Sequence, residues 1–455
     1  KQTLSTGEGS EFRKYFSFSV FIVGGVLSFL SKENTAVLPL TLLILDYLFF
    51  YNNATPFEKK RFRRIYAASI LILLPLLCYK GPEYFFSFLE GYEHRDFSLI
   101  ERLITQPRVI FFYLYLLLIP GINHLNLNHD VLISNSLFNP PQTFFAISGV
   151  LVLITCAVLL RKRCNLLSFA ILWYLGNLVI ESTIIPLELI FEHRTYLPGV
   201  LIFCFMSLGI VYAGENLIQK RSAILLTSLL LILYGNGTYL RNFTFKTPVS
   251  MWLDVVEKSP NLARAHANLG KTYIDLGYNV EGRKSLERAV EMRPYMPEAL
   301  INLGRLYIKR FGMIDEGIEL IKSAQRLNPK YILAFMALGD AYFIVKDYEK
   351  AERYYGVVLR RLNFFLPAMN NLGIVKICLG KKDEAIQLFQ NGIRLDPTYE
   401  DFYLNLAKLH SNENRFDDAI KTLEHLRAMK GSSSRGKGLL EIIVRKANAA
   451  TPVEG

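Results

Sequence analysis

The chain has 455 residues, which is room for two or three domains, and 51% of them are hydrophobic. The mean hydropathy of +0.23 is high for a soluble protein. The net charge of +12 does not indicate a nucleic-acid partner, because the densest basic clusters flank apolar segments, where such residues set membrane topology. The five cysteines lie far apart, without the spacing of a disulfide framework or a metal site.

The first half of the chain is predicted to be a multi-pass transmembrane domain over residues 1–245. A span needs about 17–25 mostly apolar residues. Segments of about this kind are found at 16–30, 35–51, 65–79, 142–160, 166–186, 196–214 and 223–240. The apolar stretch 109–120 is too short to cross comfortably, so we expect a re-entrant or interfacial segment near 84–120.

The basic clusters test this assignment, because cytoplasmic loops carry the excess of Lys and Arg. All clusters fall on one side if 109–120 does not cross, and the chain then makes seven crossings with its C-terminal half outside the cytoplasm. If 109–120 crosses, the last two clusters and the C-terminal half change sides. We favour the first arrangement. The clusters lie at 13–14, 59–64, 161–163 and 220–221.

Charged residues gather in two loops of the predicted outer face. Lys32 and Glu33 lie in one loop, and Glu192, His193 and Arg194 lie in the other. Charges so close to a bilayer are costly and often functional, so the two groups together indicate a site for an anionic headgroup. The alternative, for any single one of them, is an ordinary interfacial charge.

Three histidines lie in the long outer segment 80–141 but do not predict a metal site. His94, His124 and His129 include no pair at the i, i+4 spacing of helical ligands. We interpret them as surface or interfacial residues and expect no metal.

The second half repeats itself with the period of a tetratricopeptide (TPR) array, a stack of helix-turn-helix units. Leu-Gly or Leu-Ala pairs recur at spacings of 34, 35, 34 and 34 residues between 269 and 407. Five repeats are predicted over 263–433, after a half-repeat connector at 246–262 and before a capping helix and tail at 434–455. The fold class is therefore all-α, a transmembrane helical domain followed by an α-solenoid.

One position within the repeats is a candidate peptide-binding site. It is held by Asn268, Asn302, Asn371 and Asn405, with Ala337 as the exception. A carboxamide can donate to and accept from a peptide backbone at once, so these residues predict a ladder along one face of the solenoid. The alternative is that asparagine simply suits this position and remains solvated.

The two loop motifs together with the repeats carry a family resemblance. Ser31-Lys32-Glu33 precedes one apolar helix, and 192–198, Glu-His-Arg-Thr-Tyr-Leu-Pro, opens another. The chain resembles the transmembrane-and-TPR (TMTC-type) O-mannosyltransferases and their bacterial relatives in the GT-C glycosyltransferase superfamily. The resemblance implies a polyprenyl-phosphate-linked sugar as donor, membrane lipid around the helices, and an acceptor protein bound by the TPR groove. No further cofactor is implied.

On this resemblance, Lys32, Arg194 and His193 are the candidates for the donor phosphate, and Glu33 and Glu192 are possible acidic site residues. The family's acidic motif in the first outer loop has no counterpart before Lys32, so the catalytic base is not assigned. We expect either that an N-terminal portion carrying it is missing from this sequence or that this homologue is not an active transferase.

The leading hypothesis is a membrane transferase that modifies protein Ser/Thr on the extracytoplasmic face, in a bacterial inner membrane or, in a eukaryote, the endoplasmic reticulum. The alternative is a non-enzymatic TPR scaffold for an envelope or secretion assembly. A transporter is disfavoured because the spans show no evident inverted repeat and few intramembrane charges.

Overall fold

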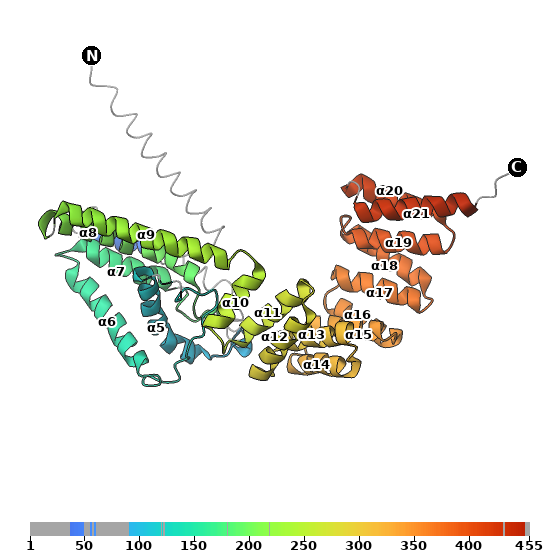
Figure 1. Ribbon diagram of the computed structural model, residues 1–455, viewed down its shortest axis with the longest axis horizontal. Helices are drawn as coiled ribbons and strands as arrows, with labels where there is room; N and C mark the ends of the chain where they lie inside the picture. The colour runs from blue at the N-terminus through green and yellow to red at the C-terminus, as the bar shows by residue number, and fades with distance from the viewer. Residues whose placement is uncertain are drawn as a thin grey trace, which may run out of the picture. The chain divides into compact units, whose positions relative to one another are not determined.

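The computed structural model describes residues 37–49, 55–56, 59–60, 91–119, 121, 123–179, 181–217, 219–430 and 433–450. In these residues every regular element is helical, which confirms the predicted all-α class (Figure 1). The chain divides into two compact units, Lys1–Pro260 and Asn261–Gly455, and each is described by itself.

The first unit holds the apolar helices. Its described elements are α2 (Leu38–Phe49), η3 (Gly91–His94), α5 (Leu99–Leu118), α6 (Gln142–Leu160), α7 (Asn165–Leu178), η4 (Glu192–Thr195), α8 (Tyr196–Asn216), α9 (Lys220–Thr244) and α10 (Pro248–Lys258).

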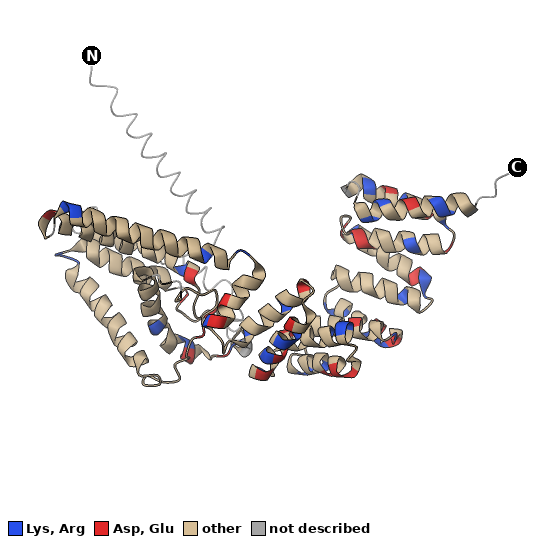
Figure 2. Ribbon diagram, viewed as in Figure 1, with Lys and Arg blue, Asp and Glu red and all other residues tan. Residues whose placement is uncertain are grey.

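Three described helical segments are long and apolar enough to cross a membrane, namely Gln142–Leu160, Glu192–Asn216 and Lys220–Thr244. Their large apolar side chains are exposed, as with Leu225 (70%) and Leu231 (68%) of α9. Figure 2 shows the middle of α6, α8 and α9 almost without charged residues, whereas charges gather where α8 meets α9. An exposed apolar surface of this extent is what a lipid environment would cover. The predicted spans 16–30 and 65–79 lie outside the described residues.

Two helices differ in length from the apolar stretches of the sequence. The helix containing 109–118 begins at Leu99, because Ser98 and Glu101 form a capping box that starts it ten residues earlier. In contrast, the predicted span 166–186 is helical only to Leu178. The residues that follow include β-branched Thr183–Ile185 and then Pro186, which disfavour a helix.

The second unit consists of five helix pairs and a final helix. The first helices of the pairs begin at Ala263, Pro297, Ile332, Leu366 and Glu400. The pairs are α11 (Ala263–Asp275) with α12 (Asn279–Met292), α13 (Pro297–Leu306) with α14 (Ile314–Leu327), α15 (Ile332–Ile344) with α16 (Tyr348–Arg361), α17 (Leu366–Cys378) with α18 (Lys382–Leu395), and α19 (Glu400–Asn412) with α20 (Phe416–Lys430). The last helix, α21 (Ser434–Ala450), packs on α20 and buries Ile443 against Leu423 and Leu426.

The Leu-Gly pairs are packing residues within each pair of helices. Leu338 is fully buried, and a Cβ atom on Gly339 would lie 2.6 Å from the ring of Tyr355. Because Tyr355 is itself 1% exposed, its ring has no room to retreat. Glycine at this position therefore allows the two helices of the third pair to approach closely.

The single 35-residue spacing has a local structural cause. Helix α13 continues into a π-helical turn, η5 (Tyr307–Phe311), which ends at Gly312 with a positive φ of 68°. A π turn accommodates one extra residue in a helix, and Gly312 adopts the left-handed conformation at no steric cost. The insertion is thus absorbed before α14 begins, and the following repeats keep their register.

His410 gives the repeats a titratable buried group. It is 5% exposed, and its Nδ1 atom has no hydrogen-bond partner among the described residues. Burial lowers its pKa below the usual 6.5; the charge of Arg415 lowers it further, whereas Asp418 and Glu413 act in the opposite direction. The folded chain therefore holds His410 neutral.

We predict that acid destabilises the fold through this residue. Below about pH 6.5 the unfolded chain binds the proton that the folded chain resists, so stability falls as pH falls. Between about pH 8 and pH 5 the wild type should lose more in Tm than His410→Gln, because only the wild type carries the imidazole whose protonation the fold opposes. Circular dichroism of the full chain in detergent measures both. Equal losses in the two proteins would contradict the assignment.

Candidate functional site

The predicted Glu-His-Arg motif lies in a loop of residues 181–195, here called the motif loop, which joins α7 to α8. Its backbone is held by Arg102 of α5, a side chain that is 0% exposed. Arg102 donates from Nε to the carbonyl of Thr183 at 3.0 Å, and also to the carbonyls of Glu181 and Leu187. Burial lowers the pKa of Arg102 to about 10, still far above neutral, so the guanidinium stays charged. One cation thereby satisfies three carbonyls that no helix could satisfy.

Other side chains complete this support. Tyr92 donates to the carbonyl of Ile184 at 2.7 Å, and Gln106 donates to that of Leu189 at 3.3 Å. The hydroxyl of Tyr113 accepts from the N–H of Phe191 at 2.8 Å. The loop is therefore irregular in conformation but well bonded, which fits a segment that positions side chains.

Arg194, the predicted phosphate ligand, forms a buried ion pair. Its Nε lies 2.7 Å from Oε2 of Glu181, and the two side chains are 5% and 6% exposed. Its Nη1 donates to the carbonyl of Glu188 at 2.7 Å, and the guanidinium lies 4.9 Å from the ring centroid of Phe191. The charge of Arg194 is thus compensated by Glu181 within the loop.

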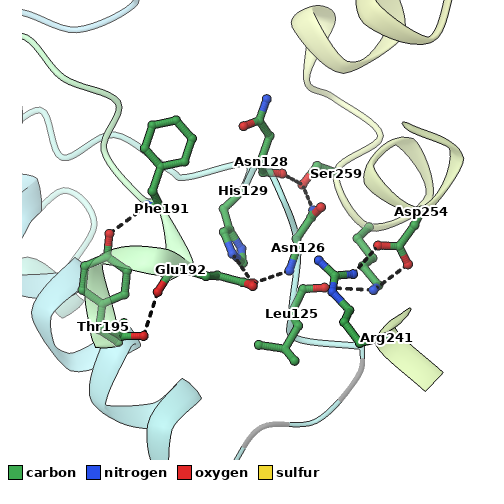
Figure 3. Close-up of polar contacts among 12 residues, drawn as sticks. Leu125, Asn126, Asn128, His129, Phe191, Glu192, Thr195, Arg241, Asp254 and Ser259 are labelled. Atoms are coloured by element: carbon green, nitrogen blue, oxygen red, sulfur yellow. Dashed lines mark hydrogen bonds and ion pairs between the residues drawn. The ribbon is translucent and has the colours of Figure 1, made fainter. Parts of the chain in front are cut away.

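Glu192 points toward residues 126–129 (Figure 3). Its Oε1 accepts from the backbone N–H of Asn126 and lies 3.1 Å from Nε2 of His129. Thr195 donates to the carbonyl of Glu192 at 2.7 Å, which closes the turn that opens α8. Arg194 and Glu192 therefore belong to two different polar clusters, although they lie in one motif.

The Glu192 cluster extends to the end of α10. Ser259, 2% exposed, accepts from Nδ2 of Asn126 at 2.9 Å and from the N–H of Asp130 at 3.1 Å, and it donates to the carbonyl of Asn128 at 3.1 Å. Lys258 donates to the carbonyl of Leu125 at 2.9 Å.

A second set of charges ties α10 to α9. Asp254 pairs with Arg241 of α9 at 2.7 Å and with Lys258 of its own helix at 2.6 Å (Figure 3). Because Thr247 and Ser250 also form a capping box at the start of α10, this helix is fixed at both ends within the first unit.

Two of the remaining predicted site residues, Lys32 and Glu33, lie outside the described residues. The ring of His193 stacks on Phe191 with centroids 5.2 Å apart. The assignment of Lys32, Arg194 and His193 to a donor phosphate stays a prediction. Sequence reasoning did not assign Arg102 and Glu181 to this site. The role of Arg102 depends on contacts about 80 residues away in sequence, and that of Glu181 depends on how the motif loop folds back on itself to Arg194.

In the second unit, the four ladder asparagines are all partly buried on first helices of their pairs. Asn371 donates to Oδ1 of Asp340 at 3.2 Å, and Asn405 donates to Oδ1 of Asn370 at 2.8 Å. Each of these two amides thus bonds to the repeat before it, and the carbonyl oxygen of Asn371 also accepts from Nδ2 of Asn370 at 3.5 Å.

Asp340 is the centre of the polar cluster on this face. Its carboxylate also accepts from Arg305 at 3.1 Å and from the hydroxyl of Tyr355 at 2.7 Å. Burial and the adjacent carboxylate raise the pKa of Tyr355, so it remains a donor. A pocket of about 260 Å³ lies here, lined by Lys309, Asp340, Phe343, Ile344, Tyr355, Asn371 and Ile374. Asp340 was not predicted, because it occupies a position that is not acidic in the other repeats.

Comparisons with known proteins support the repeats and a distant relationship for the rest. Tetratricopeptide repeat models match residues 263–295 and 379–443. The human protein O-mannosyl-transferase TMTC2 is 32% identical over 102 residues, 22% of this chain and 12% of that protein. The human protein O-mannosyl-transferase TMTC3 is 19% identical over 301 residues, 61% of this chain and 32% of that protein.

Among solved structures, PilW, described as a widely conserved type IV pilus biogenesis factor, is similar at 20% identity and a TM-score of 0.39. The match covers 47% of this chain and 96% of that one. The chain contains TPR repeats, which suggest binding of a partner protein or peptide, and it spans less than a third of the two human relatives.

We predict that Arg194→Ala destabilises the first unit by about 3–5 kcal/mol, because it leaves the buried Glu181 without its counter-charge. The double variant Glu181→Gln with Arg194→Ala should recover part of that loss, since no charge is then buried alone. Thermal unfolding in detergent measures each protein. Additive effects of the two single substitutions would show that the pair is not coupled.

Proposed function

We propose that this protein is a membrane glycosyltransferase that moves a sugar from a polyprenyl-phosphate donor to Ser or Thr of a protein, and that its TPR groove holds the acceptor. The observation that carries the proposal is the extent of the match to human TMTC3. It covers 61% of this chain, a larger share than residues 261–455 make up, so it extends upstream of the repeats into the first unit.

The chemistry of the motif loop is compatible with this role. Departure of a sugar from a lipid phosphate needs cationic stabilisation of the phosphate, and the acceptor hydroxyl needs a base. In the proposal, Lys32 supplies the charge to the donor phosphate. Arg194 and His193 remain candidates beside it, and Glu33 and Glu192 remain the acidic candidates. The bonded motif loop would hold its part of this set rigidly before the donor binds.

The TPR groove would serve the acceptor. Asn371 and Asn405 place carboxamides on first helices of their pairs, and the pocket at Asp340 offers both polar and aromatic surface. Such a face can bind the backbone of an extended peptide without requiring one sequence. We propose that this face lies on the extracytoplasmic side, where the lipid-linked donor would be used.

The second candidate is a membrane-anchored TPR scaffold without enzymatic activity. The pairing of Arg194 with Glu181 favours it, because a guanidinium already compensated by a buried carboxylate is less available to a phosphate. A scaffold would still use the TPR groove for its partner, so only the transfer reaction separates the two functions.

We predict that Lys32→Ala abolishes sugar transfer in cells while the protein remains inserted and folded. The measurement is a glycoproteomic comparison of cells carrying no copy, the wild type or the variant. Lys246→Ala, a lysine placed after α9, is the matched control and should retain transfer. A glycoproteome unchanged by loss of the wild-type gene would overturn the transferase and leave the scaffold.

We predict that replacing Asn268, Asn302, Asn371 and Asn405 together with Ala raises the acceptor KM about tenfold, because several backbone hydrogen bonds of about 0.5–1.5 kcal/mol each are lost. Donor binding should not change. Asn363→Ala, at an exposed position between α16 and α17, is the matched control. An unchanged acceptor KM in the fourfold variant would show that these asparagines do not bind the acceptor.

A further inference from the structure

The second unit holds another pocket, away from the asparagine ladder, with a different character. It has a volume of about 480 Å³ and is lined by residues of α18, α19 and α20. The lining residues are Gln390, Ile393, Arg394, Tyr403, Leu406, Lys421, Thr422 and His425. Three of these side chains can carry positive charge and none is acidic. We refer to this site as the α18–α20 pocket.

Tyr403 lines this pocket with an unsatisfied hydroxyl. The residue is 0% exposed, and its hydroxyl has no hydrogen-bond partner in the described part of the chain. A buried polar atom without a partner is costly, so such an atom beside a pocket indicates a ligand oxygen. The ring of His425, an exposed residue, meets the ring of Tyr403 edge to face, with 5.6 Å between centroids.

No described acidic residue forms an ion pair with the cations of the α18–α20 pocket. Other lysines and arginines of this unit do pair with carboxylates, among them Lys376 with Glu352 and Arg415 with Asp418. Arg394 instead donates to the neutral side chain of Asn391. A cation with a neutral partner keeps its charge available for an anion.

Equivalent positions in earlier repeats differ in the groups that accompany the shared arginine. The second helices α14, α16, α18 and α20 begin 34 residues apart, so Arg394 corresponds to Arg360 and Arg326. Arg326 is neutralised by Glu319 at 2.6 Å, but the position equivalent to Glu319 in α18 is Gln387.

The other lining positions differ in the same way. The equivalents of Tyr403, Lys421 and His425 one repeat earlier are Met369, Gln387 and Asn391. The preceding repeat therefore has neither the buried hydroxyl nor the added cations. A packing rule common to all repeats does not account for the α18–α20 pocket.

We propose that the α18–α20 pocket binds an acidic residue of a partner peptide, with the carboxylate between Arg394, Lys421 and the hydroxyl of Tyr403. Ile393 and Leu406 make part of the lining apolar, which suits a peptide that carries apolar neighbours and would be unused by inorganic phosphate. This binding does not depend on sugar transfer, so its failure and the failure of the proposed function are separate results.

The test is fluorescence polarisation of the full chain in detergent with a labelled hexapeptide of alternating Leu and Glu. The matched probe replaces Glu with Gln and should bind about tenfold more weakly or not at all, as expected when charge-assisted hydrogen bonds are removed. Arg394→Gln and Lys421→Gln should each weaken binding of the Glu peptide. Arg360→Gln, the equivalent position one repeat earlier, should leave it unchanged.

Tyr403→Phe separates binding from folding, because the lost hydroxyl has no hydrogen-bond partner among the described residues and its removal should not lower Tm. The substitution should weaken binding of the Glu peptide. Equal binding of the two peptides, or equal effects of Arg394→Gln and Arg360→Gln, would overturn the proposal. So would displacement of the Glu peptide by equimolar sodium phosphate or glycerol 3-phosphate, which would indicate a free-anion or lipid-headgroup site.

Discussion

The conformation of the motif loop in the first unit depends on one buried cation. This cation donates to backbone carbonyls that would be bonded within a helix if the segment were helical. After Leu178 the chain leaves its helix inside an otherwise apolar bundle, where each unpaired carbonyl would be costly. Arg102 supplies donors to three of those carbonyls from α5. Without it the motif loop would have to find other donors, and Arg194, Glu192 and His193 would lose their fixed positions. The side chains of interest are thus placed by a residue that is not part of the motif.

The same loop shows how one motif can serve two clusters. Arg194 turns to Glu181, inside the loop, while Glu192 turns to residues 126–129 and, through Asn126, to Ser259 at the end of α10. The polar contacts of α10 therefore join three segments that are distant in sequence but lie within one unit. In a transferase this network would hold the donor site rigid; in a scaffold it would only hold the helices together.

The second unit is built on a different principle, since each repeat contacts its neighbours and small departures remain local. The π turn after α13 absorbs an extra residue, and His410 replaces an aromatic residue at the cost of an unpaired nitrogen. Two departures from the repeat pattern bring polar side chains together in this unit. Asp340 gathers Arg305, Tyr355 and Asn371 on one face, and the last repeat alone combines Tyr403 with Lys421 and His425.

By itself the sequence determined the helical class and the repeats, because a 34-residue period and long apolar runs are local patterns that need no knowledge of distant contacts. It also predicted that Asn371 and Asn405 lie on one face. Only the tertiary structure decided that Arg102 bonds the motif loop and that Arg194 faces Glu181. The first outcome rests on hydrogen bonds that span about 80 residues of sequence, and the second rests on the fold of the loop itself; hydropathy contains neither.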